Sequence, residues 1–99
     1  MSLENLNPLS KAVRIQTPTT WQMEHSTPMF LSSSFTFDSA EEMRAAFAEE
    51  SDDNIYSRFS NPTVDEFVQK MCALEGAEAG FATASGMSAV FASFMALMK

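Results

Sequence analysis

The stretch Ala79-Gly80-Phe81-Ala82-Thr83, followed by Ala84-Ser85-Gly86-Met87, decides how this chain is expected to fold. Residues 79–83 are small and nearly uncharged, which predicts a buried strand, and Ser85 and Gly86 then break it. Residues 88–98 are long enough for a helix and apolar on almost every side, which is typical of a helix inside a larger protein. A helix, a strand, a turn and a buried helix in succession predict the beginning of an α/β fold.

An amphipathic helix is expected to begin near residue 38. Ser39 is placed to be its N-cap, and Glu42 completes a capping box three residues later. The apolar positions on one face are Met43, Ala46 and Phe47. The acidic and polar residues 49–54 that follow predict a surface loop.

A second amphipathic helix is expected after Pro62. Thr63-Val64-Asp65-Glu66 repeats the capping-box pattern and predicts the start of the helix. The apolar side chains at helical spacing are Val64, Phe67, Val68, Met71 and Leu74. Gly76 suits the C′ position that ends a helix.

Residues 1–37 show little periodicity and predict an extended arm, with one helical turn over residues 3–6. Three prolines in this region bias the preceding residues toward extended backbone, at Pro8, Pro18 and Pro28. The arm carries large apolar side chains that it cannot bury by itself, at Trp21, Met29, Phe30, Phe35 and Phe37. We therefore expect it to pack on a partner subunit or on a further part of the domain.

Composition narrows the classes of function. The chain has 99 residues, which is one domain at most, and 45% hydrophobic with 19% charged residues indicates a globular rather than a disordered protein. A formal net charge of −7 disfavours nucleic acid and anionic membrane surfaces as partners. The apolar run after Gly86 is too short to span a bilayer, and no secretory signal opens the chain.

The single cysteine, Cys72, excludes an internal disulfide and suits a reducing, cytoplasmic location. Because Cys72 lies in an expected helix, we interpret it as a buried, unreactive thiol. His25, beside Glu24, is interpreted as structural. No residue is proposed as a metal ligand.

Ser85, Gly86 and Met87 lie where a strand is expected to turn into a helix. Free backbone N–H groups at a helix N-terminus favour a phosphate, and Gly86 lets a ligand approach the backbone closely. Ser85 adds a hydroxyl donor. The alternative is a structural turn, since Ser-Gly before a helix is common, and the pattern is neither a Walker loop nor a dinucleotide fingerprint.

Tyr56 and Arg58 alternate with Ser57 in a stretch expected to be extended, so both side chains would project to one side. An arginine fork beside a phenol hydroxyl is a suitable clamp for a phosphate. The alternative is a solvated arginine with a tyrosine packed beneath it.

Taken together, three segments resemble the Cys/Met-metabolism family of pyridoxal-phosphate enzymes in order and spacing. They are Tyr56-Ser57-Arg58-Phe59-Ser60-Asn61-Pro62-Thr63, Leu74-Glu75-Gly76-Ala77-Glu78 and Ala84-Ser85-Gly86-Met87-Ser88-Ala89. Upstream, Glu24-His25-Ser26 and Phe30-Leu31-Ser32-Ser33-Ser34-Phe35 are most similar to the O-succinylhomoserine sulfhydrylase branch. The resemblance covers roughly residues 12–99.

The resemblance implies a fold type I transferase assembled as a tetramer of two tight dimers, with pyridoxal 5′-phosphate as cofactor. It implies that Tyr56 and Arg58 reach the cofactor phosphate of a neighbouring subunit. It also implies that the backbone at Gly86 and Met87, with Ser85 beside it, holds the phosphate of the chain's own cofactor. Residues 1–60 would then be an arm and helix in an intersubunit contact, and residues 61–99 the start of the cofactor domain.

The implied reaction releases succinate from the γ carbon of O-succinylhomoserine and adds sulfide to that carbon, giving homocysteine. The family's cofactor lysine has no match here, because Lys11, Lys70 and Lys99 lie in other contexts. We therefore expect a catalytically inactive N-terminal fragment, with no catalytic residue of its own and an amino-acid substrate for the whole enzyme. The alternatives are methionine γ-lyase, cystathionine γ-synthase or O-acetylhomoserine chemistry, or a non-catalytic assembly module.

Overall fold

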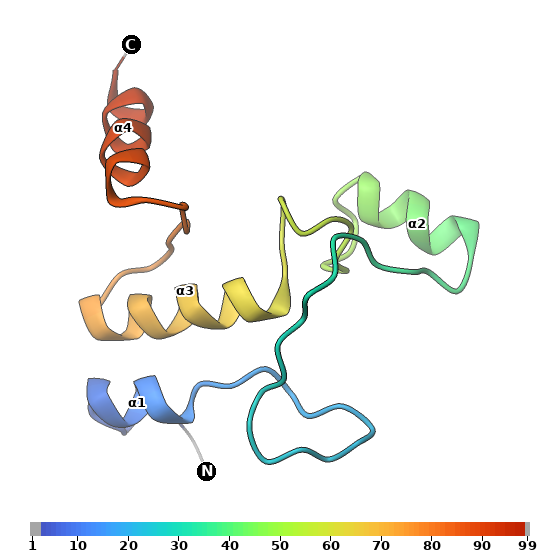
Figure 1. The fold of residues 1–99 in the computed structure, drawn as a ribbon, viewed down its shortest axis with the longest axis horizontal. Coiled ribbons are helices and arrows are strands. Elements are labelled where there is room, and N and C mark those ends of the chain that lie inside the picture. Colours follow the sequence, from blue (N-terminus) through green and yellow to red (C-terminus); the bar gives the residue numbers. More distant parts are fainter. Residues whose placement is uncertain (1–2, 99) are drawn as a thin grey trace.

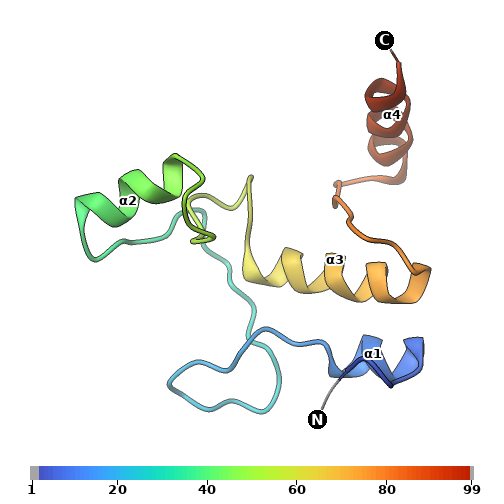
Figure 2. The ribbon, with the colours of Figure 1, turned by 180° about the vertical axis from the view of Figure 1, so that it is seen from behind.

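The computed structural model describes residues 3–98. It contains the helices α1 (Pro8–Arg14), α2 (Ala40–Phe47), α3 (Pro62–Glu75) and α4 (Gly86–Leu97). Figure 1 shows α1 and α3 side by side, with α2 and α4 standing apart from them and from each other. The view from behind in Figure 2 shows the same separation, and α1 with α3 is the only helix pair in contact among the described residues.

Helix α3 begins earlier than the sequence predicted. Its N-cap is Asn61, whose Oδ1 accepts a hydrogen bond from the Thr63 N–H at 2.9 Å, and Pro62 occupies the first turn. The predicted capping box from Thr63 to Glu66 is therefore wrong. The helix ends as predicted, at Gly76, which adopts the left-handed conformation with φ of 67°.

Helix α1 lies within the region that was predicted to be extended. Asn7 caps it by accepting from the Ser10 N–H at 2.9 Å, and Pro8 stands at the start of the first turn. An Asn-Pro pair followed by helix-forming residues is a helix-start signal that the sequence interpretation missed. The single turn expected over residues 3–6 does form, with the Leu6 N–H donating to the Leu3 carbonyl at 3.2 Å.

Helix α2 begins where the sequence predicted. The Ser39 hydroxyl accepts from the Glu42 N–H at 3.1 Å, which confirms Ser39 as the N-cap. The Glu42 carboxylate closes the box onto the Asp38 N–H, at 3.1 Å, one residue before the position that a capping box usually uses. Of the apolar face, only Ala46 is buried, while Met43 and Phe47 remain exposed.

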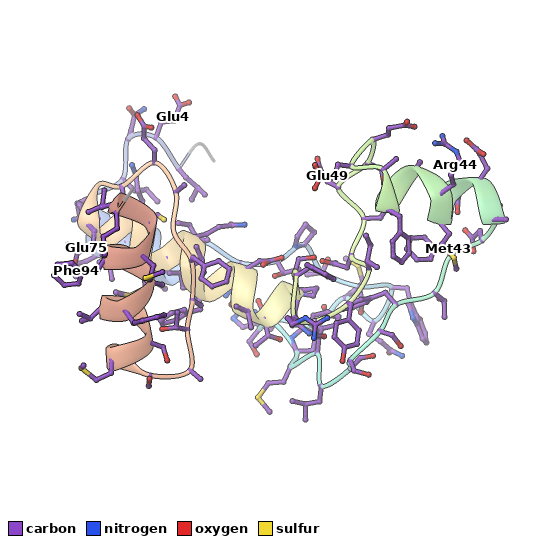
Figure 3. The ribbon with its side chains drawn as sticks, turned by 90° about the horizontal axis from the view of Figure 1, so that it is seen from above. Glu4, Met43, Arg44, Glu49, Glu75 and Phe94 are labelled. Carbon is purple, nitrogen blue, oxygen red and sulfur yellow. The ribbon has the colours of Figure 1, made fainter. Side chains whose placement is uncertain are left out.

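The predicted strand over residues 79–83 does not form, so the α/β description is not realised in residues 3–98, where the regular elements are helices alone. A strand requires a neighbour to pair with its backbone, and the described residues provide none for this segment. Helix α4 forms with Ser85 as its N-cap, and nothing covers it within residues 3–98, whereas its burial was expected inside a larger protein. Its large apolar side chains are exposed, and Phe94 projects away from the ribbon in Figure 3.

The whole chain is open for its size. Its radius of gyration is 15.8 Å, against about 13 Å for a compact domain of this length. Its accessible surface is 8314 Å², against about 5,600 Å² expected for a folded monomer of this mass. Among the described residues only Ala46 and Asn61 are buried, so the fold is held by local helices and polar contacts rather than by an apolar core.

Candidate functional site

Tyr56 and Arg58 lie together, although the backbone between them is not extended as predicted. Residues 57–59 form a turn, in which the N–H groups of Phe59 and Ser60 both donate to the Tyr56 carbonyl, at 2.9 and 3.1 Å. The Arg58 guanidinium carbon lies 5.2 Å from the centre of the Tyr56 ring and 5.5 Å from that of Phe59. Cation–π stacking, rather than strand alternation, brings the two predicted residues to one place.

Arg58 has no carboxylate partner and no hydrogen bond among residues 3–98. Arg44 is the opposite case, because it pairs with Glu41 at 2.7 Å and with Glu50 at 2.8 Å. The Glu41 carboxylate, followed by that of Glu50, raises the pKa of Arg44 above its ordinary value. The guanidinium N–H groups of Arg58 are therefore available to an external anion, whereas those of Arg44 are already used.

The turn that carries Arg58 is tied to the extended arm. The Ser57 N–H donates to the Ser33 carbonyl at 2.9 Å, and the Ser57 hydroxyl donates to the Ser32 carbonyl. Ser34 and Tyr56 form an isolated antiparallel bridge at the same place. The position of the turn thus depends on a segment more than twenty residues away in the sequence.

Glu66 of α3 holds a second part of the arm. Its Oε1 accepts from the Thr17 N–H at 2.7 Å and from the Thr27 hydroxyl at 2.5 Å, so one carboxylate closes the loop between these residues. The Thr27 hydroxyl is the largest cause that lowers the pKa of Glu66, with smaller contributions from Thr17 and Lys70. Sequence reasoning assigned Glu66 to a helix cap and missed this long-range role.

The second predicted anion-binding site is the N-terminus of α4. The Ser85 hydroxyl accepts from the Ser88 N–H at 3.1 Å, and the Ser85 carbonyl accepts from the Ala89 N–H at 3.2 Å. The N–H groups of Gly86 and Met87 have no acceptor among the described residues. A Cβ added at Gly86 would meet no atom within 4 Å, so the backbone there is open to a ligand.

An open groove of about 540 Å³ runs between the Arg58 turn, one side of α3 and residues 80–84. Its lining includes Arg58 and also Ala84, the neighbour of Ser85. At Gly80, which also lines the groove, a Cβ would lie 3.1 Å from the Cys72 Sγ, so this backbone packs closely on α3. Cys72 is half-buried.

The structure thus brings Tyr56 and Arg58 together and places Ser85, Gly86 and Met87 at a separate helix end. No hydrogen bond joins the two groups among residues 3–98. Within the same residues there is no cluster of three or more potential metal-binding side chains, and no helix has the length and apolar character needed to cross a membrane.

Sequence similarity to known proteins extends over most of the chain. The model of the family described as Cys/Met metabolism PLP-dependent enzyme matches residues 10–99. O-succinylhomoserine sulfhydrylase of Pseudomonas aeruginosa is 48% identical over 86 residues, which are 87% of this chain and 21% of that protein. L-methionine gamma-lyase of Pseudomonas putida is 42% identical over 73% of this chain and 18% of that protein.

O-acetyl-L-homoserine sulfhydrylase 1 of Thermus thermophilus is 41% identical over 83% of this chain and 19% of that protein. The chain therefore spans about a fifth of the length of the curated relatives that it matches. The family match extends over most of the chain and includes both groups of predicted site residues. The chain belongs to the Cys/Met metabolism family of pyridoxal-phosphate-dependent enzymes.

Proposed function

We propose that this chain is the N-terminal part of a sulfhydrylase that makes homocysteine from O-succinylhomoserine and sulfide. The observation that carries the proposal is the 48% identity to an O-succinylhomoserine sulfhydrylase, which exceeds the identities to the gamma-lyase and the O-acetyl-L-homoserine enzyme. The match to the family model shows that the chain belongs to the family. The sulfhydrylase reaction is our proposal for which member of the family it is.

The described residues fit the phosphate of pyridoxal 5′-phosphate. Arg58 presents a guanidinium with no acceptor of its own among residues 3–98, and the Tyr56 phenol lies beside it. Gly86 and Met87 present two unsatisfied N–H groups at the positive end of α4. Two anion-binding groups in an otherwise acidic chain support a phosphate ligand more strongly than either does alone.

We assign Tyr56 and Arg58 to the cofactor phosphate of a neighbouring copy, and Ser85, Gly86 and Met87 to the chain's own cofactor. The division of the chain into an intersubunit arm (residues 1–60) and the start of the cofactor domain (residues 61–99) is part of the same proposal. When bound, the cofactor supplies an electron sink for the substrate. The residues of this chain bind and orient its phosphate.

None of the three lysines is assigned a catalytic role. Lys70 is placed on α3 beside Glu66, with 3.8 Å between Nζ and Oε2, and Lys11 lies on α1. We propose that the 99-residue chain is inactive by itself. Purified chain mixed with cofactor, O-succinylhomoserine and sulfide should release no homocysteine, and turnover in this assay would contradict the assignment.

The cofactor site is best tested in a chimera in which residues 10–99 replace the matched segment of the Pseudomonas aeruginosa relative. Arg58→Ala in this chimera should weaken cofactor binding roughly 10- to 100-fold, because a hydrogen-bonded contact to a charged phosphate is lost. Fluorescence titration of the cofactor-free protein measures the affinity. Arg44→Ala is the matched control, since that guanidinium is occupied by Glu41 and Glu50, and it should leave the affinity unchanged.

Mixed oligomers test whether Arg58 acts on its own copy or on a neighbour. One chimera carries Arg58→Ala, and the other lacks the family's cofactor lysine in the segment from the relative. If Arg58 serves a neighbour, unfolding and refolding the two together should restore activity, because a mixed dimer contains one intact site. If the mixture stays inactive although mixed dimers form, the neighbour assignment is wrong.

The gamma-lyase is the second candidate function, because its 42% identity also covers most of the chain. A substrate panel on the chimera would report mainly the relative's own specificity. The polypeptide encoded by the complete reading frame is therefore the right sample for this question. Sulfide-dependent release of succinate supports the sulfhydrylase, and release of methanethiol from methionine supports the lyase.

A non-catalytic assembly module is the remaining alternative, and the exposed apolar side chains of α4 favour it. The coding sequence beyond Lys99 separates it from the enzyme. A continuing frame with a lysine in the family's context supports the sulfhydrylase proposal. A stop codon directly after Lys99 supports the module.

A further inference from the structure

Asn61 is the only buried polar residue among residues 3–98, with 4% of its surface exposed. Its Nδ2 donates to the Phe30 carbonyl at 2.9 Å and to the Ser57 hydroxyl oxygen at 3.0 Å. Its Oδ1 accepts from the Thr63 N–H at 2.9 Å. One amide side chain therefore joins the arm, the turn before Arg58 and the first turn of α3.

These contacts exceed what a helix cap requires. Capping uses only the Oδ1 acceptor, as Asn7 shows at the start of α1, where Oδ1 accepts from the Ser10 N–H and Nδ2 makes no bond to another described residue. The two bonds from the Asn61 Nδ2 lead away from the helix, to Phe30 and Ser57. Ser57 is the residue immediately before Arg58.

Among residues 3–98, Arg58 itself is held only by stacking on the rings of Tyr56 and Phe59. A long side chain with this much freedom loses entropy when it binds an anion, and a fixed backbone reduces that loss. The backbone of the turn is fixed through Ser57, and Ser57 is fixed in turn by the arm and by Asn61. Asn61 thus acts on Arg58 through the residue between them.

We propose that Asn61 is a positioning residue that pre-organises Arg58 for the cofactor phosphate. The proposal rests on the phosphate role assigned to Arg58 above. In this proposal the two ends of the Asn61 amide have different functions. Oδ1 caps the N-terminus of α3, whereas Nδ2 orients the turn that carries Arg58.

Asn61→Asp separates these functions, since it retains the acceptor at the cap and removes both donors. In the chimera we expect this change to weaken cofactor binding roughly tenfold. Asn7→Asp makes the same chemical change at an exposed cap without long-range bonds, and it should leave the affinity unchanged. Ser57→Ala removes one acceptor without burying a charge and should weaken binding in the same direction but less.

A double-mutant cycle distinguishes positioning from general destabilisation. If Asn61 acts through Arg58, Asn61→Asp should have little further effect on cofactor affinity once Arg58→Ala is present. If the fold-losses in cofactor affinity caused by the two substitutions instead multiply in the double variant, Asn61 supports the structure in general and the positioning role is overturned. The cycle compares cofactor affinities rather than activities, so its result does not depend on the rate of the chemical step.

Amide hydrogen exchange in the 99-residue chain gives a second readout that is independent of the cofactor. Asn61→Asp should accelerate exchange at the Ser57 and Phe59 N–H groups more than at the Ala77 N–H, which bonds to the Cys72 carbonyl at the far end of α3. Equal acceleration at both ends would overturn the proposal. If the unsubstituted chimera binds no cofactor, the proposed function fails, while the exchange result still decides whether Asn61 orders the turn.

Discussion

Two regions of this molecule are organised by different forces. In the first, the arm and the start of α3 (residues 15–66), side chains bond to distant backbone groups, as Glu66 bonds to the Thr17 N–H and Asn61 to the Phe30 carbonyl. In the second, residues 76–98, α4 contacts no other helix among the described residues and its large apolar side chains face outward. We call these the polar-tied region and the C-terminal region.

The difference shows what each kind of interaction requires. A hydrogen bond is local and directional, so a few side chains can fix one segment on another without a large interior. Burial of apolar surface is non-directional and needs a second surface of similar extent. The polar-tied region therefore has a defined arrangement within this chain, and the C-terminal region requires another surface to cover it.

The largest expected effect comes from α4. Phe91 and Phe94 are 67% and 64% exposed, and burying a phenylalanine contributes about 1.5–3 kcal/mol. We expect the chain to self-associate at micromolar concentration, and Phe91→Asp with Phe94→Asp to weaken association at least tenfold. Sedimentation velocity over a dilution series measures this.

The matched control places the same two charges on exposed polar positions of the arm, as Thr19→Asp with Gln22→Asp. Association should then be almost unchanged, which separates loss of apolar contact from added charge. A wild-type chain that remains monomeric at every concentration would contradict the interpretation of α4 as a surface that needs covering.

A smaller effect is expected at Glu66 in the polar-tied region. Glu66→Ala leaves the Thr17 N–H and the Thr27 hydroxyl without their acceptor, at a cost of about 1–3 kcal/mol for partly buried groups. The change should speed hydrogen exchange at Thr17 and lower the urea midpoint. Lys70→Ala, which removes only the 3.8 Å ion pair with Glu66, should cost at most about 1 kcal/mol.

The smallest effect is the dependence of the arm on pH. The Thr27 hydroxyl lowers the pKa of Glu66 in the folded chain below 4.5, so unfolded chains take up the proton first. The stabilisation by this carboxylate is therefore complete well above pH 4.5. It is lost as the pH falls through the pKa that Glu66 has in the folded chain. The protection factor at the Thr17 N–H, which corrects for the intrinsic pH dependence of amide exchange, should fall on acidification below about pH 4.5, and Glu66→Gln should remove most of that dependence.

Glu24 titrates in the same direction, because the Thr20 N–H and hydroxyl lower its pKa. Glu24→Gln is thus a control for arm contacts other than Glu66. If it removed the pH dependence at Thr17 while Glu66→Gln did not, the assignment of the acid response to Glu66 would be wrong.

Local signals in the sequence predicted local structure well. Ser39 caps α2 and Gly76 ends α3 because both positions depend on residues within one helical turn. The same reasoning failed at residues 79–83, since a strand depends on a partner that lies elsewhere in a fold. It also assigned Thr63 and Glu66 to a helix cap, although both bond to the arm, to Phe30 and Thr17.

For the candidate site too, the sequence predicted the local features and not the long-range contacts. The residue types and order that indicate a phosphate, Tyr56 with Arg58 and Ser85 with Gly86, were readable from the sequence and from its resemblance to a family. The sequence did not indicate that Arg58 would stack on Tyr56 and Phe59, or that Asn61 and Ser57 would tie its turn to the arm.

The amino-acid sequence by itself therefore indicated the family, the start of α2, the end of α3 and the residue types of the proposed anion-binding site, because these depend on residue type and short spacing. The tertiary structure decided which segments are held in place and which remain uncovered. Contacts such as Asn61 with Phe30 join residues about thirty positions apart, and no local pattern encodes such a pairing. The exposed α4 follows the same physics, because burial depends on a second surface that its own sequence does not supply.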